Sequence, residues 1–309
     1  MSTPRSLQLP AGVRRFTVET GRGSFAALEA LPVAGPCERQ PALLVPGYTG
    51  SKEDFIPVLQ PLAAAGRRVV AVDQRGQYET AGSSDPDAYG LPALAADAAA
   101  VVAELSRQDG QPPAAAGGQR PHLLGHSFGG LVARELVISL AAPVSSLTLL
   151  SSGPAALTGP RAAVLRNMLA QLDGKPPAEL PGEVKRLWDS HLEPQAVADG
   201  VPPEIIDFLR TRMLASCATG LKFMAESLLS CPDRTSMLAG LPGARVLVVY
   251  GEDDDAWVPA IQEDMARRLG AQRVCIPGAA HSPAVEAPET AASTLTTFWN
   301  AVECGKPGH

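Results

Sequence analysis

The apolar positions of the chain fall into a strand-like pattern and a helical one. Val13 to Val18 and Phe25 to Leu31 alternate around Gly21 and Gly23, which predicts a β-hairpin. Short apolar runs then alternate with segments of helical spacing. The predicted strands are ALLV (42–45), RRVVAVD (67–73), HLLGH (122–126) and VSSLTLLSS (144–152), and the predicted helices cover 53–66, 91–105 and 131–140. This order is typical of βαβ units, in which helices cover both faces of a mostly parallel sheet.

The rhythm changes after Gly153. Residues 160 to about 236 contain helical segments and no convincing strand. Strand character returns in ARVLVVYG (244–251), and a helix (259–269), a short strand (272–278) and a final helix ending near Val302 follow. We therefore expect one α/β domain, formed by residues 1–153 and 241–309, with a helical insertion at 154–240. Residues 109–121, rich in Pro, Gly and Ala, are expected to form a surface loop.

Composition indicates an ordinary globular protein, with 45% apolar and 19% charged residues. A net charge of −6 and the lack of a basic run argue against nucleic acid or an anionic membrane as the main partner. The cysteines form no C-x-x-C pair, so we expect neither a disulfide framework nor a zinc site. They are Cys37, Cys217, Cys231, Cys275 and Cys304. No apolar run has membrane-spanning length and no signal region is evident, which predicts a soluble, cytoplasmic protein.

The candidate nucleophile is Ser127, in the G-x-S-x-G sequence of residues 125–129. This motif follows a predicted strand and precedes a predicted helix, which is the context that a nucleophile elbow requires. Glycines on both sides of the serine remove side chains that would clash in so tight a turn. The N-terminus of the following helix favours negative charge that develops at the serine.

A serine hydroxyl needs a base, and His281 is the candidate. Where a nucleophile elbow is used, the acid and then the histidine follow the serine along the chain. Of the five histidines, only His281 falls between the last strand and the last helix. The others lie in the strand before the elbow, inside the elbow, in the insertion and at the end of the chain. They are His122, His126, His191 and His309.

The candidate acid lies in GEDDDAW (251–257), at the end of the preceding strand. One carboxylate there can orient the imidazole of His281 and stabilise its charged form. Spacing from Gly251 favours Asp254, whereas spacing back from Pro259 favours Asp255. We take Asp254 as the acid and keep Asp255 as the alternative.

The turn PGYTGSK (46–52) superficially suggests a phosphate-binding loop. A P-loop requires G-x-x-x-x-G-K-[ST]. Counted from Gly47, the second glycine and Lys52 fall at the wrong positions, and no Ser or Thr follows the lysine. The spacing therefore excludes a nucleotide loop of this type.

With these motifs the chain resembles the α/β-hydrolases, in the lid-bearing group of serine esterases, lipases, lactonases and cofactor-free haloperoxidases. The resemblance extends from about Phe16 to Trp299. It rests on VPGYTG (45–50), VVAVDQRGQYETAGSSD (69–85), GHSFGG (125–130), YGEDDDAW (250–257) and GAAHSP (278–283). The resemblance implies an eight-stranded, mostly parallel sheet with helices on both faces, and it makes residues 154–240 a helical lid.

The resemblance also assigns roles to two further segments. The loop after the third strand and the residue after the nucleophile would each donate a backbone N–H to an oxyanion hole, which implies the amides of Tyr48 and Phe128. The family usually has a histidine where this chain has Pro46, which has no N–H to donate. Asp73 and Arg75, in a D-x-R-G turn, are expected to act as a turn-fixing pair.

We therefore expect a serine hydrolase that cleaves a carboxylic ester-type bond in a small, apolar substrate through an acyl-enzyme, with no metal and no organic cofactor. Candidates to line its pocket are Trp188, Phe223, Met224 and Trp257, although apolar residues at helical spacing more often form core. Two alternatives stay open. The same triad suits a lactone, a thioester, a carbon–carbon bond or perhydrolysis, and the fold also allows a non-catalytic binding module. The oligomeric state is not indicated.

Overall fold

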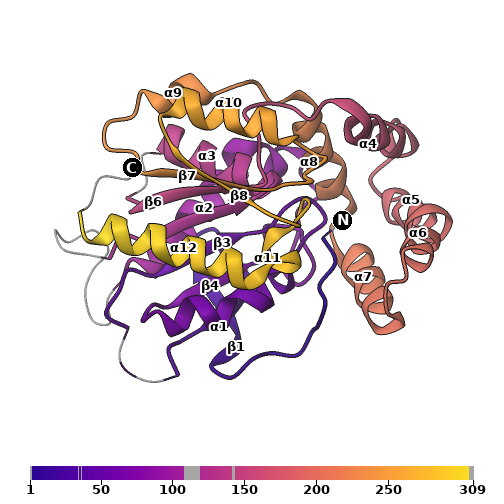
Figure 1. Ribbon diagram of the computed structural model, residues 1–309. Coiled ribbons are helices and arrows are strands. Elements are labelled where there is room, and N and C mark those ends of the chain that lie inside the picture. The colour runs from indigo at the N-terminus through magenta and orange to yellow at the C-terminus, as the bar shows by residue number, and fades with distance from the viewer. Residues whose placement is uncertain (1, 34, 36, 108–118, 141–142, 306–309) are drawn as a thin grey trace.

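One eight-stranded sheet forms the centre of the molecule (Figure 1). The computed structural model describes residues 2–33, 35, 37–107, 119–140 and 143–305, so residues 109–118 of the predicted surface loop lie outside the described part. The spatial order is β1, β2, β4, β3, β5, β6, β7, β8. The strands are β1 Val13–Thr20, β2 Gly23–Ala30, β3 Ala42–Val45, β4 Val69–Val72, β5 His122–His126, β6 Ser146–Leu150, β7 Val246–Gly251 and β8 Gln272–Ile276. β2 pairs antiparallel with both β1 and β4, and all other neighbouring strands pair parallel, which confirms the predicted α/β fold.

Helices cover both faces of the sheet, which explains why its central strands are continuous apolar runs. Helices α1, α11 and α12 pack on one face, and α2, α3 and α10 pack on the other (Figure 1). The bounds are α1 Ile56–Ala64, α2 Leu91–Leu105, α3 Phe128–Leu140, α10 Pro259–Leu269, α11 Pro283–Glu286 and α12 Pro288–Glu303. Short 3₁₀ segments, η1 Lys52–Phe55 and η2 Pro86–Tyr89, precede α1 and α2.

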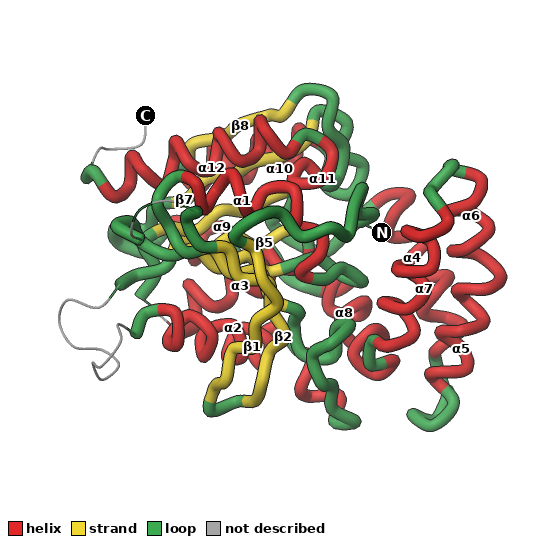
Figure 2. The backbone as a smooth tube through the Cα atoms, turned by 90° about the horizontal axis from the view of Figure 1, so that it is seen from below, coloured by secondary structure: helices red, strands yellow, loops and turns green. Residues whose placement is uncertain are grey.

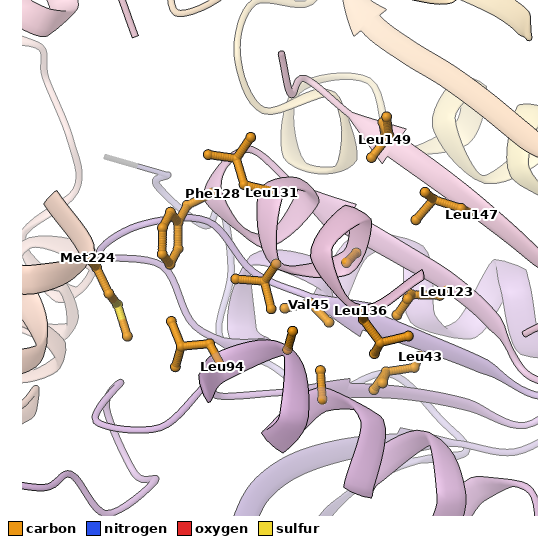
Figure 3. Packing of buried hydrophobic residues seen from close by; sticks show 14 of the residues in the cluster. Leu43, Val45, Leu94, Leu123, Phe128, Leu131, Leu136, Leu147, Leu149 and Met224 are labelled. Carbon is orange, nitrogen blue, oxygen red and sulfur yellow. The ribbon is translucent and has the colours of Figure 1, made fainter. Parts of the chain in front are cut away.

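The larger apolar cluster lies on the α2 and α3 face of the sheet and reaches the start of α3 (Figure 3). Leu123 of the sheet and Leu131 of α3 are fully buried in it. Burying one such side chain stabilises the fold by about 1.5–3 kcal/mol. The cluster therefore fixes α3, and with it the turn that connects β5 to α3.

Between β6 and β7 the chain forms helices and no strand. Its elements are α4 Gly159–Leu172, α5 Leu180–Leu187, a π-helical turn η3 Trp188–Leu192, α6 Glu193–Ala198, α7 Pro203–Ala215, α8 Ala218–Ser230 and α9 Thr235–Ala239. Helices α4 to α7 stand together beside the sheet (Figure 2). The middle of this insertion, Leu172 to Leu221, has an apolar cluster of its own. Leu165 of α4 and Leu228 of α8 instead join the sheet cluster, so the insertion is attached to the sheet at both ends.

A buried polar cluster ties α12 to the end of the sheet opposite the β5–α3 turn. His122 is fully buried, with Nδ1 2.7 Å from the Ser146 hydroxyl and Nε2 3.1 Å from Glu303. Arg67 donates to the same carboxylate at 2.8 Å, and its guanidinium lies over Trp299. Burial raises the pKa of Glu303, but hydrogen bonds from His122 and Arg67 and the charge of Arg67 outweigh it and hold this pKa at about 2.

Glu303→Gln should lower the free energy of unfolding by about 2 kcal/mol near neutral pH, because Arg67 would be left buried without a counter-charge. The pKa of Glu303 is below its ordinary value of 4.5 in the folded state, so the stabilisation is complete above that value and is lost as the pH falls toward 2. Urea unfolding of both proteins should give a difference that shrinks with acidification. Glu289→Gln, at an exposed site on α12, is the matched control, and a pH-independent difference would contradict the prediction.

Candidate active site

Ser127 occupies a strained turn between β5 and α3. Its φ is +54°, in the left-handed region that non-glycine residues seldom adopt. The flanking glycines are required by close contacts with backbone atoms. A Cβ on Gly125 would lie 2.2 Å from the Gly129 carbonyl oxygen, and one on Gly129 would lie 2.4 Å from the Val45 carbonyl oxygen. The turn therefore packs directly against the end of β3, with no room for a side chain at either glycine.

The structure brings together the three side chains that the sequence analysis selected as a triad. Ser127 Oγ lies 3.0 Å from His281 Nε2, and His281 Nδ1 lies 2.9 Å from Asp254 Oδ1. The serine follows β5, the aspartate follows β7 and the histidine follows β8. Because these strands are parallel, their carboxyl ends lie at one edge of the sheet. The arrangement allows the imidazole to remove the hydroxyl proton while the carboxylate orients the ring.

Asp254 and Asp255 have different surroundings. Burial alone would raise the pKa of Asp254, but hydrogen bonds from His281, the Ala256 amide and Gln262, with the charge on His281, hold it below its usual value. Asp254 is therefore a buried carboxylate with partners on both oxygens. The Asp255 side chain is 61% exposed and pairs with Arg161 on α4.

His126, inside the elbow, is a second buried imidazole at the site. Its Nε2–H donates to the His281 backbone carbonyl over 2.7 Å. Burial, assisted by the charge of His281, lowers the pKa of His126 to about 3. Its ring is therefore neutral near pH 7. His191 is exposed on the insertion, and His309 lies outside the described residues. The position of His126 in the elbow was evident from the sequence, but its hydrogen bond to the backbone of His281 was not predicted.

The loop after β3 lies against the nucleophile. A Cβ on Gly47 would lie 3.1 Å from the Ser127 Cβ. The backbone amides of Tyr48 and Phe128, expected as oxyanion donors, border this contact, and in the described part of the chain neither donates to a backbone carbonyl. The Phe128 side chain is fully buried and points toward Met224 and Leu94 (Figure 3). Its contribution at the surface of the site is therefore limited to its backbone.

Two glutamines of the D-Q-R-G-Q turn hold the loop after β3. Gln74 donates to the Pro46 carbonyl at 2.9 Å, and Gln77 donates to the Gly47 carbonyl at 2.8 Å. Gln77 also accepts from the Gln74 amide, so the two glutamines are linked to each other as well as to the loop. Neither glutamine was predicted as a site residue. Their only signal was their place in a turn expected to be structural.

Gln77→Leu should lower kcat by about tenfold for any reaction that uses the Tyr48 amide. The reason is that a small misplacement of a catalytic group has a large effect on rate. The substitution should also destabilise the fold by about 1–3 kcal/mol, since the Gln74 amide loses its partner and the Gly47 carbonyl keeps only the Gly50 amide. Steady-state kinetics and thermal unfolding would measure both effects. Gln171→Leu, at an exposed position on α4, is the control, and an unchanged kcat would show that the glutamine does not position the loop.

Asp73 and Arg75 do not form the turn-fixing pair that we expected. Asp73 accepts from the Lys52 amide and ammonium, both at 2.8 Å, whereas Arg75 pairs with Asp97 on α2. Each residue therefore anchors the turn to a different neighbour. The sequence motif indicated their structural role but not their partners, which come from η1 and α2.

A cavity of about 470 Å³ opens beside Ser127 and His281. Its lining combines the loop after β3, the triad region and the insertion. The larger apolar side chains of the lining are Leu157, Val164, Leu165, Met168, Leu192 and Leu228. Arg161 and Asp255 also line it. The shape and lining fit a small, largely apolar ligand with a polar group at Ser127.

None of the four predicted pocket residues lines this cavity. Trp188 is fully buried in the cluster of the insertion. Met224 and Trp257 are buried in the sheet cluster, and Phe223 packs against it. Trp257 also donates to the Ala155 carbonyl at 3.1 Å. These side chains therefore form core, and smaller aliphatic residues of the insertion face the cavity instead.

The described residues contain no group of three or more His, Cys, Asp or Glu side chains arranged to hold a metal ion. In the same part of the chain, no helix combines the length and apolar character needed to cross a bilayer. All five cysteines are free thiols.

Residues 42–294 match the model of the Alpha/beta hydrolase family. The chain belongs to this family. This α/β-hydrolase is 36% identical over 120 residues to a candidate carbamate hydrolase, RutD, of Variovorax paradoxus (strain S110). That match spans 39% of the chain and 41% of the relative, so less than half the length of the curated relative is covered.

Solved structures share the fold of this α/β-hydrolase along almost its whole length. A thermophilic esterase from Thermogutta terrifontis has a TM-score of 0.67 and 23% identity, with 94% of this chain and 99% of that chain covered. The enol-lactonase from Burkholderia xenovorans LB400 also has a TM-score of 0.67, with 17% identity and coverage of 92% and 100%. At these identities the likeness establishes the fold, while the family match establishes a hydrolase.

Proposed function

We propose that this α/β-hydrolase cleaves a carboxylic ester-type bond through an acyl-enzyme formed on Ser127. The observation that carries the proposal is the hydrogen-bonded chain from Ser127 through His281 to Asp254, beside a cavity. A binding module would have no need for a strained serine paired with an imidazole and a buried carboxylate.

In the proposed first step His281 removes the proton of Ser127 as the hydroxyl oxygen attacks the substrate carbonyl. The amides of Tyr48 and Phe128 would donate to the oxyanion of the tetrahedral intermediate. His281 then protonates the leaving alcohol. In the second step it activates a water molecule that releases the acid and restores the serine. Asp254 stabilises the imidazolium form of His281 in both steps.

The aliphatic lining supports an apolar acyl group as the preferred substrate part. Leu165, Met168 and Leu228 come from the insertion, which supports its proposed role as a lid over the serine. We expect kcat/KM for nitrophenyl esters to rise from acetate to medium-length acyl chains, since each buried methylene contributes about 0.8 kcal/mol. A series of graded chain lengths measures this trend, and a monotonic fall from acetate would contradict an apolar acyl site.

A fluorophosphonate probe tests the chemistry independently of the natural substrate. An activated serine should become covalently labelled, and peptide mass spectrometry should place the label on Ser127. Heat-denatured protein is the control, because the free hydroxyl of an unfolded serine is not nucleophilic enough to react. Lack of labelling in the folded protein would instead favour a non-catalytic binding module.

A second candidate keeps the same residues but changes the bond that is cleaved. A triad with an oxyanion hole also suits lactones, carbamates and thioesters. The structural likeness to an enol-lactonase favours testing lactones, and the partial match to a candidate carbamate hydrolase favours testing carbamates. A panel of acyl esters, lactones, carbamates and thioesters at equal concentration would separate these substrates by kcat/KM.

A further inference from the structure

Arg212 connects the helical insertion to the loop beside Ser127. It lies on α7 and is fully buried. Its Nη1 donates to Asp54 Oδ1 at 2.8 Å, and its Nη2 donates to the Ser2 carbonyl at 2.7 Å. A guanidinium is costly to bury unless it is paired and hydrogen-bonded, so the position of α7 depends on this carboxylate.

Asp54 belongs to the same loop as Tyr48. Its second oxygen, Oδ2, accepts from the Ser51 amide, and a Cβ on Gly50 would lie only 2.6 Å from it. The Gly50 amide in turn donates to the Gly47 carbonyl at 3.1 Å. The carboxylate therefore packs tightly on a short turn that begins where the loop touches Ser127.

The Tyr48 side chain provides a second link between the two parts. It packs against both the sheet cluster and the cluster of the insertion. Moving α7 would therefore disturb Tyr48 from both directions, through its ring and through the turn that Asp54 holds.

The remaining anchors of this loop come from the sheet domain. Gln74 and Gln77 hold its first carbonyls, and Lys52 pairs with Asp73 at 2.8 Å. The Arg212–Asp54 pair is the buried ion pair through which the insertion holds the far end of the loop. A shift of the insertion would therefore move, through this ion pair, the loop that carries the Tyr48 amide.

We propose that Arg212 is a positioning residue for the oxyanion hole. Through Asp54 it holds the turn of residues 47–54 so that the Tyr48 amide faces the nucleophile only when α7 is packed in place. This inference rests on the proposed ester hydrolysis at Ser127. It makes the insertion part of the catalytic geometry as well as part of the cavity wall.

Arg212→Met is the first variant, because it keeps the aliphatic stem and removes the charge and donors. We expect kcat for a nitrophenyl ester to fall by about 10- to 100-fold, with KM changed by less than about threefold. Arg210→Met is the matched control. It lies on the same helix, and its guanidinium lies 3.7 Å from the carboxylate of the exposed Asp189.

Affinity for a trifluoromethyl ketone separates positioning from a purely structural role. This inhibitor forms a hemiketal oxyanion on the nucleophile, so its binding reports the oxyanion hole directly. Its inhibition constant should rise by the same factor as kcat falls. Arg212→Lys and Asp54→Asn, which disturb packing less, provide the same measurements if Arg212→Met does not fold.

A double-mutant cycle tests whether the effect passes through Asp54. Arg212→Met combined with Asp54→Asn should be no slower than the worse single variant, because both changes break one link. Folded variants that lose thermal stability but keep kcat and inhibitor affinity within about twofold of wild type would overturn the inference. Ser127→Ala distinguishes failure of the proposed function from failure of this inference. If Ser127→Ala stays active, the proposed function fails and this inference fails with it. If it is inactive while the Arg212 variants keep full activity, only this inference fails.

Discussion

Ser127→Ala should lower kcat for short acyl esters by at least about 10⁴-fold, because the proposed acyl-enzyme forms on this hydroxyl. KM should change much less, since the aliphatic side chains that line the cavity are untouched. The folded state should survive, because the variant removes one oxygen from a site that tolerates alanine sterically. The positive φ of +54° strains the wild type and the variant alike, so little change in thermal stability is expected.

The measurement is steady-state hydrolysis of nitrophenyl acetate and butyrate, with unfolding curves to show that the variant is folded. Ser152→Ala is the matched control. Ser152 is also fully buried at the end of a neighbouring strand, and its hydroxyl has no hydrogen-bond partner in the described part of the chain. The control should retain activity. Hydrolysis by Ser127→Ala at the wild-type rate would refute the assignment of the nucleophile.

Asp254→Asn should reduce kcat by about 10²- to 10⁴-fold, whereas Asp255→Asn should change it by less than about threefold. The asparagine amide cannot stabilise the imidazolium form of His281, and it favours the wrong tautomer of the ring. Asp255 makes its contact with Arg161 at the exposed rim of the cavity, where an ion pair contributes less than about 1 kcal/mol.

The two variants should be compared under identical conditions, since they differ only in which neighbouring carboxylate is neutralised. Arg161→Met provides a further check, because loss of the rim ion pair by either partner should have the same small effect. If Asp255→Asn proved the more damaging substitution, the triad acid would be misassigned. Similar losses in both would indicate that the acidic loop as a whole, rather than one carboxylate, supports His281.

Several elements of the fold could be predicted because their local sequence permits one structure. ALLV at 42–45 is a strand and 91–105 and 259–269 are helices, with the predicted bounds. Short apolar runs and helical spacing are strong signals.

The pocket residues could not be predicted in the same way. Trp188 and Leu165 are both apolar residues of the insertion, yet the first is in its core and the second faces the cavity.

The sequence by itself determined the family, the strand order along the chain and the few residues that could serve as nucleophile and base. Tight turns require glycine, and a motif such as G-x-S-x-G records that requirement within five adjacent positions. The tertiary structure alone decided which carboxylate meets His281, which glutamines hold the loop after β3 and which charge of the insertion reaches Asp54. Those contacts join segments far apart in the chain. Their distances depend on how helices pack on the sheet, which local patterns do not encode.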